Sequence, residues 1–327
     1  MITYRKATAN DVRPALDFAL RVFMEFDAPD FEPVYTINFK KGVMENDAYI
    51  ERLLSNENLM FVALDGDKIV GMVAERNDGE ILLLFVDGAY HKQGIATVLL
   101  SDMICALKLQ GFDKITLESS PSAIPFYLKY GFRQRDDTES KYGFVYTPME
   151  YIPNEIWDVL DSNGNKTGLF HERGRPMNAG DYHLCVHVWK HNGRGEWLID
   201  KRTHKTSGDI NGGKWETTGG AAIAGDDSLT AALRETKEEL GLDLDPAKGV
   251  LFRHFAREGF YGHTYIMDVW VFEHDCTITD IHFDERETCE AMWATAGQIR
   301  RLLRDNEFFS DVDLYFDGMV DEWRAAK

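Results

Sequence analysis

Hydrophobic positions in the first part of the chain follow two different periods. Apolar residues recur at helical spacing over residues 11–26 and 48–55, whereas residues 59–64 and 68–75 are β-rich runs joined by an Asp-Gly-Asp turn. An Asp-Gly turn between two such runs is typical of a β-hairpin. This part of the chain therefore predicts a domain that mixes helices with strands.

An unbroken apolar run, Ile-Leu-Leu-Leu-Phe-Val, occupies residues 81–86. Such a run lacks the alternation of a half-exposed strand and predicts a central strand covered on both faces. Residues 95–108 follow as a largely buried helix that ends before Gly111. The turn between this strand and this helix points backbone N–H groups toward the helix N-terminus, where an anion can bind.

The second part of the chain predicts a different order of elements. The predicted elements are a hairpin with its turn at residues 163–165, strands at 183–190, 196–201 and 265–273, and helices at 228–240, 296–304 and 314–326. Two prolines in residues 147–153 interrupt both periodicities. We place the boundary there, which gives domains 1–148 and 149–327.

Composition narrows the class of protein. The 327 residues are 44% hydrophobic and 28% charged, which is typical of about two ordered domains. Acidic residues outnumber basic ones by 55 to 36, for a net charge of −19, so we expect small-molecule substrates and no nucleic-acid partner. No apolar run approaches the ~18 residues of a membrane span, which indicates no membrane partner. The composition does not indicate an oligomeric state.

The location of the protein is predicted from its first residues and its cysteines. Charges occur throughout the first 20 residues, unlike a secretory signal. The four cysteines lie far apart without a C-x-x-C pair, which fits thiols in a reducing compartment. We therefore expect a cytoplasmic protein.

Three acidic residues gather on one face of the helix predicted at 228–240. At about 100° per residue, Glu235, Glu238 and Glu239 fall within one arc, while an apolar stripe occupies another face. Glutamates on a helix are commonly solvated surface. Here the glycines before and after the helix let the backbone approach the three carboxylates. Clustered carboxylates repel one another unless a cation lies among them, and hard oxygen ligands suit Mg²⁺ or Mn²⁺.

This stretch resembles the Nudix box, G-x5-E-x7-R-E-U-x-E-E-x-G-U, where U is a bulky aliphatic residue. The matching positions are Gly220, Arg234, Glu235, Glu238, Glu239, Gly241 and Leu242. Two positions depart from the pattern, because Asp226 stands where Glu is usual and Thr236 replaces an aliphatic residue. We expect these two changes to weaken the support of the site without abolishing it.

The resemblance implies hydrolysis of a nucleoside diphosphate linked to another group, with divalent cations bound by the protein. It implies that Glu235, Glu238 and Glu239 are metal ligands and that one of them acts as base, with the carbonyl of Gly219 as a further ligand. A further acid often comes from outside the box, and Glu287 is the candidate, with a plain surface role as the alternative. Trp215, Phe260 and Tyr261 are candidates to stack on a base, with a core role as the alternative.

Residues 183–189 and 214–220 resemble the Nudix branch that also contains isopentenyl-diphosphate isomerase. This similarity raises the alternative of a diphosphate isomerase. That enzyme couples a catalytic cysteine to a remodelled box, whereas no cysteine lies beside residues 217–219 here and the acids of the box are intact. A hydrolase is therefore favoured.

Two motifs in the first part resemble the GNAT acetyltransferases. The turn at residues 91–96 resembles their acetyl-CoA loop, Q/R-x-x-G-x-G/A, except that His91 takes the Gln or Arg position. Residues 126–132 resemble the GNAT motif F-Y-x-x-x-G-F, and the resemblance extends over about residues 1–146.

The GNAT resemblance implies acetyl transfer from acetyl-CoA to an amine. It implies that Val86 donates its backbone N–H to the thioester carbonyl and that Tyr127 protonates the departing thiolate. Glu75 and Glu118 are candidate bases. The residues implied to bind the pyrophosphate are Gln93, Gly94, Ile95, Ala96 and Thr97.

The sequence therefore predicts an α+β protein of two domains, a GNAT-like mixed sheet with flanking helices followed by a Nudix α/β/α sandwich. The predicted function is that of a bifunctional enzyme, a Mg²⁺-dependent or Mn²⁺-dependent hydrolase fused to an acetyltransferase. Two alternatives remain open. In one the GNAT domain senses acyl-CoA without catalysis, as His91 suggests, and in the other the second domain is an isomerase.

Overall fold

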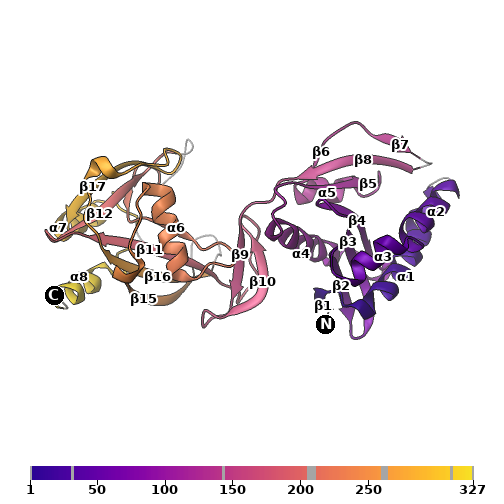
Figure 1. The fold of residues 1–327 in the computed structure, drawn as a ribbon, viewed down its shortest axis with the longest axis horizontal. Coiled ribbons are helices and arrows are strands. Elements are labelled where there is room, and N and C mark those ends of the chain that lie inside the picture. The colour runs from indigo at the N-terminus through magenta and orange to yellow at the C-terminus, as the bar shows by residue number, and fades with distance from the viewer. Residues whose placement is uncertain are drawn as a thin grey trace. The chain divides into compact units, whose positions relative to one another are not determined.

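The structure of the chain is a computed structural model that describes residues 2–30, 33–141, 144–204, 211–258, 264–309 and 312–325. These residues fold into two compact units (Figure 1). Unit 1 is Met1–Ile156 with Glu172–Gly174, and unit 2 is Trp157–His171 with Arg175–Lys327. The two units are described separately below.

The elements of unit 1 alternate as the periodicity of the sequence predicts. Its helices are α1 (Ala9–Phe26), α2 (Pro33–Phe39) running into a π-helical turn (Lys40–Met44), α3 (Asp47–Leu54), α4 (Ile95–Leu109) and α5 (Ile124–Tyr130). Its strands are β1 (Ile2–Lys6), β2 (Met60–Asp65), β3 (Lys68–Glu75), β4 (Glu80–Val86), β5 (Ile115–Ser119), β6 (Arg133–Gln134), β7 (Glu139–Lys141) and β8 (Phe144–Tyr151).

The strands of unit 1 form one mixed sheet in the order β1-β2-β3-β4-β5-β8-β6, with β7 beside β8. All neighbours are antiparallel except β4 and β5, which are parallel. Among the described residues, β4 and β5 pair only at Glu80 with Thr116 and at Ile81 with Leu117. Beyond these pairs the sheet is open between the two strands.

Helices cover both faces of this sheet. On one face α1 and α3 bury Leu16, Phe23 and Ile50 against β2 and β3. On the other face α4 and α5 bury Leu99 and Met103, among others. The mixed sheet with flanking helices is confirmed.

The segment around the predicted domain boundary differs from expectation. The sequence predicts a break in regular structure at residues 147–153. In the structure β8 runs through Pro148, and its residues 147–151 pair with the whole of β5. Proline lacks a backbone N–H, but its carbonyl can still accept a hydrogen bond from a neighbouring strand. The carbonyl of Pro148 accepts the backbone N–H of Arg135 at 2.9 Å. The boundary between residues 148 and 149 lies within this strand and stays a prediction.

The elements after β8 begin with the predicted hairpin, β9 (Ile156–Leu160) and β10 (Lys166–Glu172). The further strands are β11 (His183–His191), β12 (Glu196–Arg202), β13 (Trp215–Glu216), β14 (Gly219–Ala221), β15 (Gly249–Glu258), β16 (Thr264–Glu273) and β17 (Thr288–Thr295). The helices are α6 (Ser228–Leu240), α7 (Ala296–Arg304) and α8 (Phe316–Ala325).

The strands of unit 2 that carry its core follow the order β13-β12-β11-β16-β15, with β14 beside β11 and β17 beside β12. Alternate residues of β11 face opposite layers. Val186 and Val188 pack on α6, whereas Trp189 packs on the layer of α7 and α8. The α/β/α sandwich predicted for this part is confirmed. None of the described helices is long and apolar enough to cross a membrane.

The contact of β3 with α4 yields a prediction about stability. A Cβ added at Gly71 would lie 2.9 Å from Ile95 Cγ2 and 3.0 Å from Leu99 Cδ1. Gly71→Val should therefore overpack this interface and lower the free energy of unfolding by about 1–3 kcal/mol. Gly42→Ala, where an added Cβ meets nothing within 4 Å, is the matched control.

Denaturation followed by two signals measures this effect. All seven tryptophans lie in unit 2, so their fluorescence follows that unit, while circular dichroism follows both. Gly71→Val should shift the circular-dichroism transition and leave the tryptophan transition in place. An unchanged circular-dichroism midpoint would contradict the packing described.

Candidate functional site

The carboxylate helix of unit 2 is fixed at both ends by its own sequence. At its N-terminus the side chain of Asp227 accepts the backbone N–H of Thr230 at 2.7 Å, and at its C-terminus Gly241 adopts the left-handed conformation at φ 68°. The helix packs through Ala231 and Ala232 on the sheet. Ala231, Glu235 and Glu239 are four residues apart, so these two acids share the side of α6 that faces the sheet.

The departures from the box pattern are accommodated within the helix. Thr236 is fully buried, and its hydroxyl donates to the carbonyl of Ala232 at 2.9 Å, so it packs in place of an aliphatic residue. Asp226 accepts Arg234 Nε at 3.0 Å. Arg234 also donates to Glu238 at 2.8 Å and to the carbonyl of Ala221 at 3.0 Å. Aspartate at position 226 therefore keeps its contact with the box arginine.

The three box carboxylates have different surroundings. The side chain of Glu238 is 57% exposed and that of Glu235 is 12% exposed, and both pair with Arg234 Nη1, at 2.8 and 3.0 Å. Glu239 Oε2 is shielded from solvent and has no hydrogen-bond partner among the described residues. Burial raises the pKa of Glu239 well above its usual range, and the charges of Asp200 and Glu216 raise it further.

Glycines bring the backbone of β14 against these carboxylates. A Cβ at Gly220 would lie 2.5 Å from Oε1 of Glu235, and a Cβ at Gly219 would collide with the carbonyl of Val186. Only glycine therefore fits at position 219, and a side chain at position 220 would displace the carboxylate of Glu235. The structure brings Gly219, Glu235 and Glu239 to one place, as the resemblance implies.

A further acid, Glu216, lies close to the box carboxylates and was missed by the sequence analysis. Glu216 on β13 has a side chain only 13% exposed, and it accepts Arg202 Nη1 at 2.7 Å. Burial, with the nearby charge of Asp200, raises the pKa of Glu216 to about 8. Glu287 lies near enough for its charge to act on Arg202 and on Glu216. The sequence signal that could have located Glu216 is its position four residues before Gly220, between Trp215, a residue type common in strands, and two threonines.

A buried lysine, Lys190, supplies positive charge to this cluster of carboxylates. Lys190 Nζ donates to Thr218 Oγ1, and Thr218 Oγ1 donates to Asp200 Oδ2 at 2.7 Å. Burial lowers the pKa of Lys190 to about 8, while Asp200 and Glu239 favour its charged form. Sequence periodicity predicts β11 but gives no signal for a lysine inside the core.

The residues present fit a hard divalent cation by their chemistry. The donors are carboxylate and backbone carbonyl oxygens, and Glu239 Oε2 meets no partner in the part of the chain that the structure describes. The charges of Asp200, Glu216 and Glu235 all act on Glu239, so the place carries excess negative charge. Among the described residues, no three His, Cys, Asp or Glu side chains are arranged as a complete metal-binding group. The proposed ligands stay a prediction.

Aromatic candidates for stacking on a base receive less support. Trp215 is 8% exposed and packs in the core, with Lys201 Nζ 5.3 Å from its ring centroid. Phe260 and Tyr261 lie outside the described residues.

In unit 1 the turn between β4 and α4 takes the form the sequence predicts. Lys92 and Gly94 adopt positive φ angles of 62° and 82°, and no side chain caps the N-terminus of α4. The side chain of Ile95 is buried, so only its backbone is available. Gln93 and Thr97 are exposed beside it, whereas Ala96 is half-buried. Backbone N–H groups at the start of this helix can therefore donate hydrogen bonds to a phosphate group.

The departure at His91 has a structural role. His91 Nε2 lies 3.0 Å from the carbonyl of Val86, and its ring packs 5.1 Å from that of Phe26. Histidine therefore ties the turn back to the end of β4.

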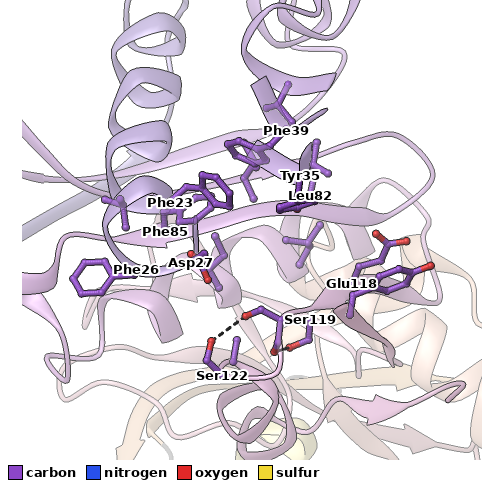
Figure 2. A pocket seen from close by; sticks show the side chains of 18 of the residues that line it. Phe23, Phe26, Asp27, Tyr35, Phe39, Leu82, Phe85, Glu118, Ser119 and Ser122 are labelled. Atoms are coloured by element: carbon purple, nitrogen blue, oxygen red, sulfur yellow. Dashed lines mark hydrogen bonds between the residues drawn. The ribbon is translucent and has the colours of Figure 1, made fainter. Parts of the chain in front are cut away.

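A cavity of about 510 Å³ opens where β4 and β5 separate (Figure 2). Val86 and Tyr127, which the resemblance implicates in acetyl transfer, both line it. Burial raises the pKa of the Tyr127 hydroxyl, and the charge of Asp27 raises it further, so this hydroxyl keeps its proton. The run at residues 81–86 is apolar because it faces the cavity as well as the core. Helix α1 contacts β4 on one face and α4 contacts it on the other, so the prediction that both faces are covered is confirmed.

The two candidate bases are separated by the structure. Glu118, at the end of β5, lines the cavity. Glu75 is 2% exposed and does not line it, and its Oε1 accepts the backbone N–H of Leu59 at 2.9 Å. Glu75 therefore has a structural role.

Comparison with known protein families matches two models to this chain. Residues 181–313 match the NUDIX domain, and residues 27–153 match the acetyltransferase (GNAT) domain. An uncharacterized Nudix hydrolase of Listeria monocytogenes is 34% identical over 157 residues, which are 47% of this chain and 88% of that protein. The chain belongs to the Nudix family. Its first part is a GNAT domain, so both predicted resemblances are confirmed.

Two N-acetyltransferases are also similar to parts of this Nudix and GNAT fusion. N-alpha-acetyltransferase 30 of Schizosaccharomyces pombe is 35% identical over 83 residues, which are 22% of this chain and 55% of that protein. A solved N-acetyltransferase of Thermoplasma acidophilum in complex with coenzyme A is 20% identical with a TM-score of 0.41, and the match covers 46% of this chain and 99% of that chain. The predicted similarity to the isomerase branch stays a prediction.

The lysine inside the Nudix domain can be tested by its removal. Lys190→Met leaves Asp200 buried without its cation, so the free energy of unfolding should fall by about 3–5 kcal/mol. Tryptophan fluorescence during denaturation measures this loss. Asp200→Asn in the Lys190→Met background should restore part of it, and strictly additive losses would contradict the coupling.

Proposed function

We propose that the Nudix domain hydrolyses a nucleoside diphosphate derivative with the help of Mg²⁺ or Mn²⁺, and that the GNAT domain transfers an acetyl group from acetyl-CoA to an amine. The observation that carries the first activity is the shielded, unpartnered Glu239 Oε2 beside Glu235 and the glycines of β14. A cation at that position would relieve the repulsion among the carboxylates.

Each residue of the Nudix site has a separate task in this proposal. Glu235, Glu239 and the Gly219 carbonyl would hold the cation, with Glu238 released from Arg234 to join them. Such an ion, when bound, neutralises a diphosphate and lowers the pKa of its water. Arg234 keeps the loop before α6 in place through Asp226 and the carbonyl of Ala221. One of the three glutamates accepts the proton of the attacking water.

Removing one carboxylate at a time tests the hydrolase. Glu239→Gln and Glu238→Gln should each lower kcat for Mg²⁺-dependent phosphate release by about 100-fold or more, because a ligand or base is lost. Glu322→Gln on α8, where the 58% exposed carboxylate pairs with Arg253, is the control. The assay uses a panel of nucleoside diphosphate derivatives with and without Mg²⁺.

Two outcomes would contradict this assignment. Unchanged rates in both variants would contradict the proposal that Glu238 and Glu239 bind the metal ion. Exchange of isomers in an isoprenoid diphosphate without phosphate release would instead support the isomerase alternative.

The GNAT proposal depends on Val86 and Tyr127 lining one cavity next to the uncapped N-terminus of α4. The residues Gln93, Gly94, Ile95, Ala96 and Thr97 would bind the pyrophosphate of acetyl-CoA through backbone N–H groups. Val86 would donate its N–H to the thioester oxygen, where negative charge develops.

The transfer step conserves atoms and charge. The ammonium first loses a proton to a base, for which Glu118 is the candidate, and the neutral nitrogen attacks the thioester carbon. The C–N bond forms, the C–S bond breaks, and Tyr127 gives its proton to the thiolate. The tyrosinate then takes the surplus proton from the amide nitrogen, so one proton per turnover passes to solvent.

Tyr127→Phe tests this role. Loss of the acid should lower kcat for CoA release by about 100-fold while the KM for acetyl-CoA changes little. Tyr130→Phe is the matched control, because Tyr130 lies on the same helix but is not among the residues that line the cavity. Tight binding of acetyl-CoA without CoA release from any amine would support the sensor alternative.

A further inference from the structure

The cavity of the GNAT domain has the size of a small-molecule site. Its volume of about 510 Å³ falls in the usual range of roughly 300–1,000 Å³. Residues from α1, α2, β4, β5 and the start of α5 line it (Figure 2). The part near Val86 and Tyr127 is the part that the proposed thioester would occupy. The part between α1 and α2 is left for the amine.

Aromatic rings form the wall of this second part. Phe23 stacks on Phe39 with centroids 4.3 Å apart, Tyr35 meets Phe23 edge-on at 5.8 Å, and Phe85 of β4 meets Phe39 edge-on at 6.4 Å. Figure 2 shows these rings gathered on one side of the cavity. Phe23 and Phe39 belong to the buried core, so the wall is held in place from behind. It offers a ligand an apolar surface made of ring faces and ring edges.

The charged groups of the cavity are mostly acidic. Carboxylates of Asp27, Glu80 and Glu118 line it, and the guanidinium that lines it, Arg76, is held by Glu80 at 2.7 Å. Asp27 caps the C-terminus of α1 and lies beside the aromatic wall (Figure 2). Its charge acts on the hydroxyls of both Tyr35 and Tyr127. Asp27 therefore lies between the aromatic wall and the acid of the proposed reaction.

A buried polar group also points to a ligand here. Tyr127 is only 8% exposed and lines the cavity, and no hydrogen bond to its hydroxyl exists within the part of the chain that the structure describes. Buried hydroxyls normally have a partner. An atom of a bound molecule would supply it.

We propose that this cavity selects a small primary amine with an aromatic or aliphatic body, an inference that rests on the proposed acetyltransferase function. The ammonium would lie at Asp27, and the body would pack against Phe23, Tyr35 and Phe39. An ammonium between aromatic faces and a carboxylate is bound by both. Glu80 is already paired with Arg76, and Glu118 is assigned as the base, so the further ammonium groups of a polyamine would lie against the apolar wall. Acidic amines are repelled by the carboxylates.

The experiment measures acetylation of a matched panel by the full chain. The panel contains 2-phenylethylamine, spermidine, glutamate and a short peptide with a free amino end. We expect kcat/KM to be at least about tenfold higher for 2-phenylethylamine than for the other three amines. Preference for spermidine or for the peptide would overturn the proposal.

Asp27→Asn separates the ammonium contact from the rest of the site. This variant should raise the KM for 2-phenylethylamine by about tenfold or more and leave the KM for acetyl-CoA unchanged. Asp17→Asn, on the exposed side of the same helix, is the control and should change neither constant. An unchanged KM for the amine in Asp27→Asn would overturn the role of Asp27.

A binding measurement keeps this inference distinct from the proposed function. Calorimetric titration of 2-phenylethylamine into the protein saturated with CoA needs no turnover, and Asp27→Asn should weaken that binding by the same factor. CoA release from every amine at similar rates would overturn the selectivity but uphold acetyl transfer. Binding of the amine with no CoA release would contradict acetyl transfer but uphold the site.

Discussion

Repulsion among carboxylates that share a shielded place is the constraint on which the Nudix domain depends. Glu239 lies among the charges of Asp200, Glu216 and Glu235, and no residue that the structure describes is a hydrogen-bond partner of its Oε2. Burying charge of one sign costs free energy unless an opposite charge is near. Lys190 and Arg202 supply two such charges, one through Thr218 and one by direct contact with Glu216. The remaining imbalance is what a divalent cation would neutralise.

An interrupted sheet plays the corresponding part in the GNAT domain. Parallel strands β4 and β5 pair at two positions and then separate. The opening receives side chains from both strands and from helices of both faces, so groups far apart in the sequence line one cavity. A fully paired sheet would have no room for Tyr127 to face a substrate. In each domain the site lies where regular structure stops.

Regular elements were predictable because their signals are local. Residues 68–75, 228–240 and 296–304 were predicted with the bounds that β3, α6 and α7 have in the structure. Helix α2 was missed because it is short. Strand β8 was missed because Pro148 is unusual in a strand, and this strand is stabilised by its pairing with β5. Long-range pairing of this kind leaves no periodic trace in the sequence.

The candidate sites were predictable only as far as a motif extends. The Nudix box located Glu235, Glu238 and Glu239, but Glu216, Lys190 and Asp200 come from other strands and needed the fold. In the GNAT domain the motif located Tyr127, while Asp27 and the aromatic wall come from helices outside it. Their contribution follows from packing, which sequence spacing does not record.

Anomalous diffraction at the manganese edge, from crystals of the full chain grown with Mn²⁺, tests the central claim most directly. The account predicts an anomalous peak bounded by Glu235, Glu239 and the carbonyl of Gly219, and its loss in Glu239→Gln crystals. Well-ordered density for these side chains with no manganese between them, at saturating Mn²⁺, would contradict the account.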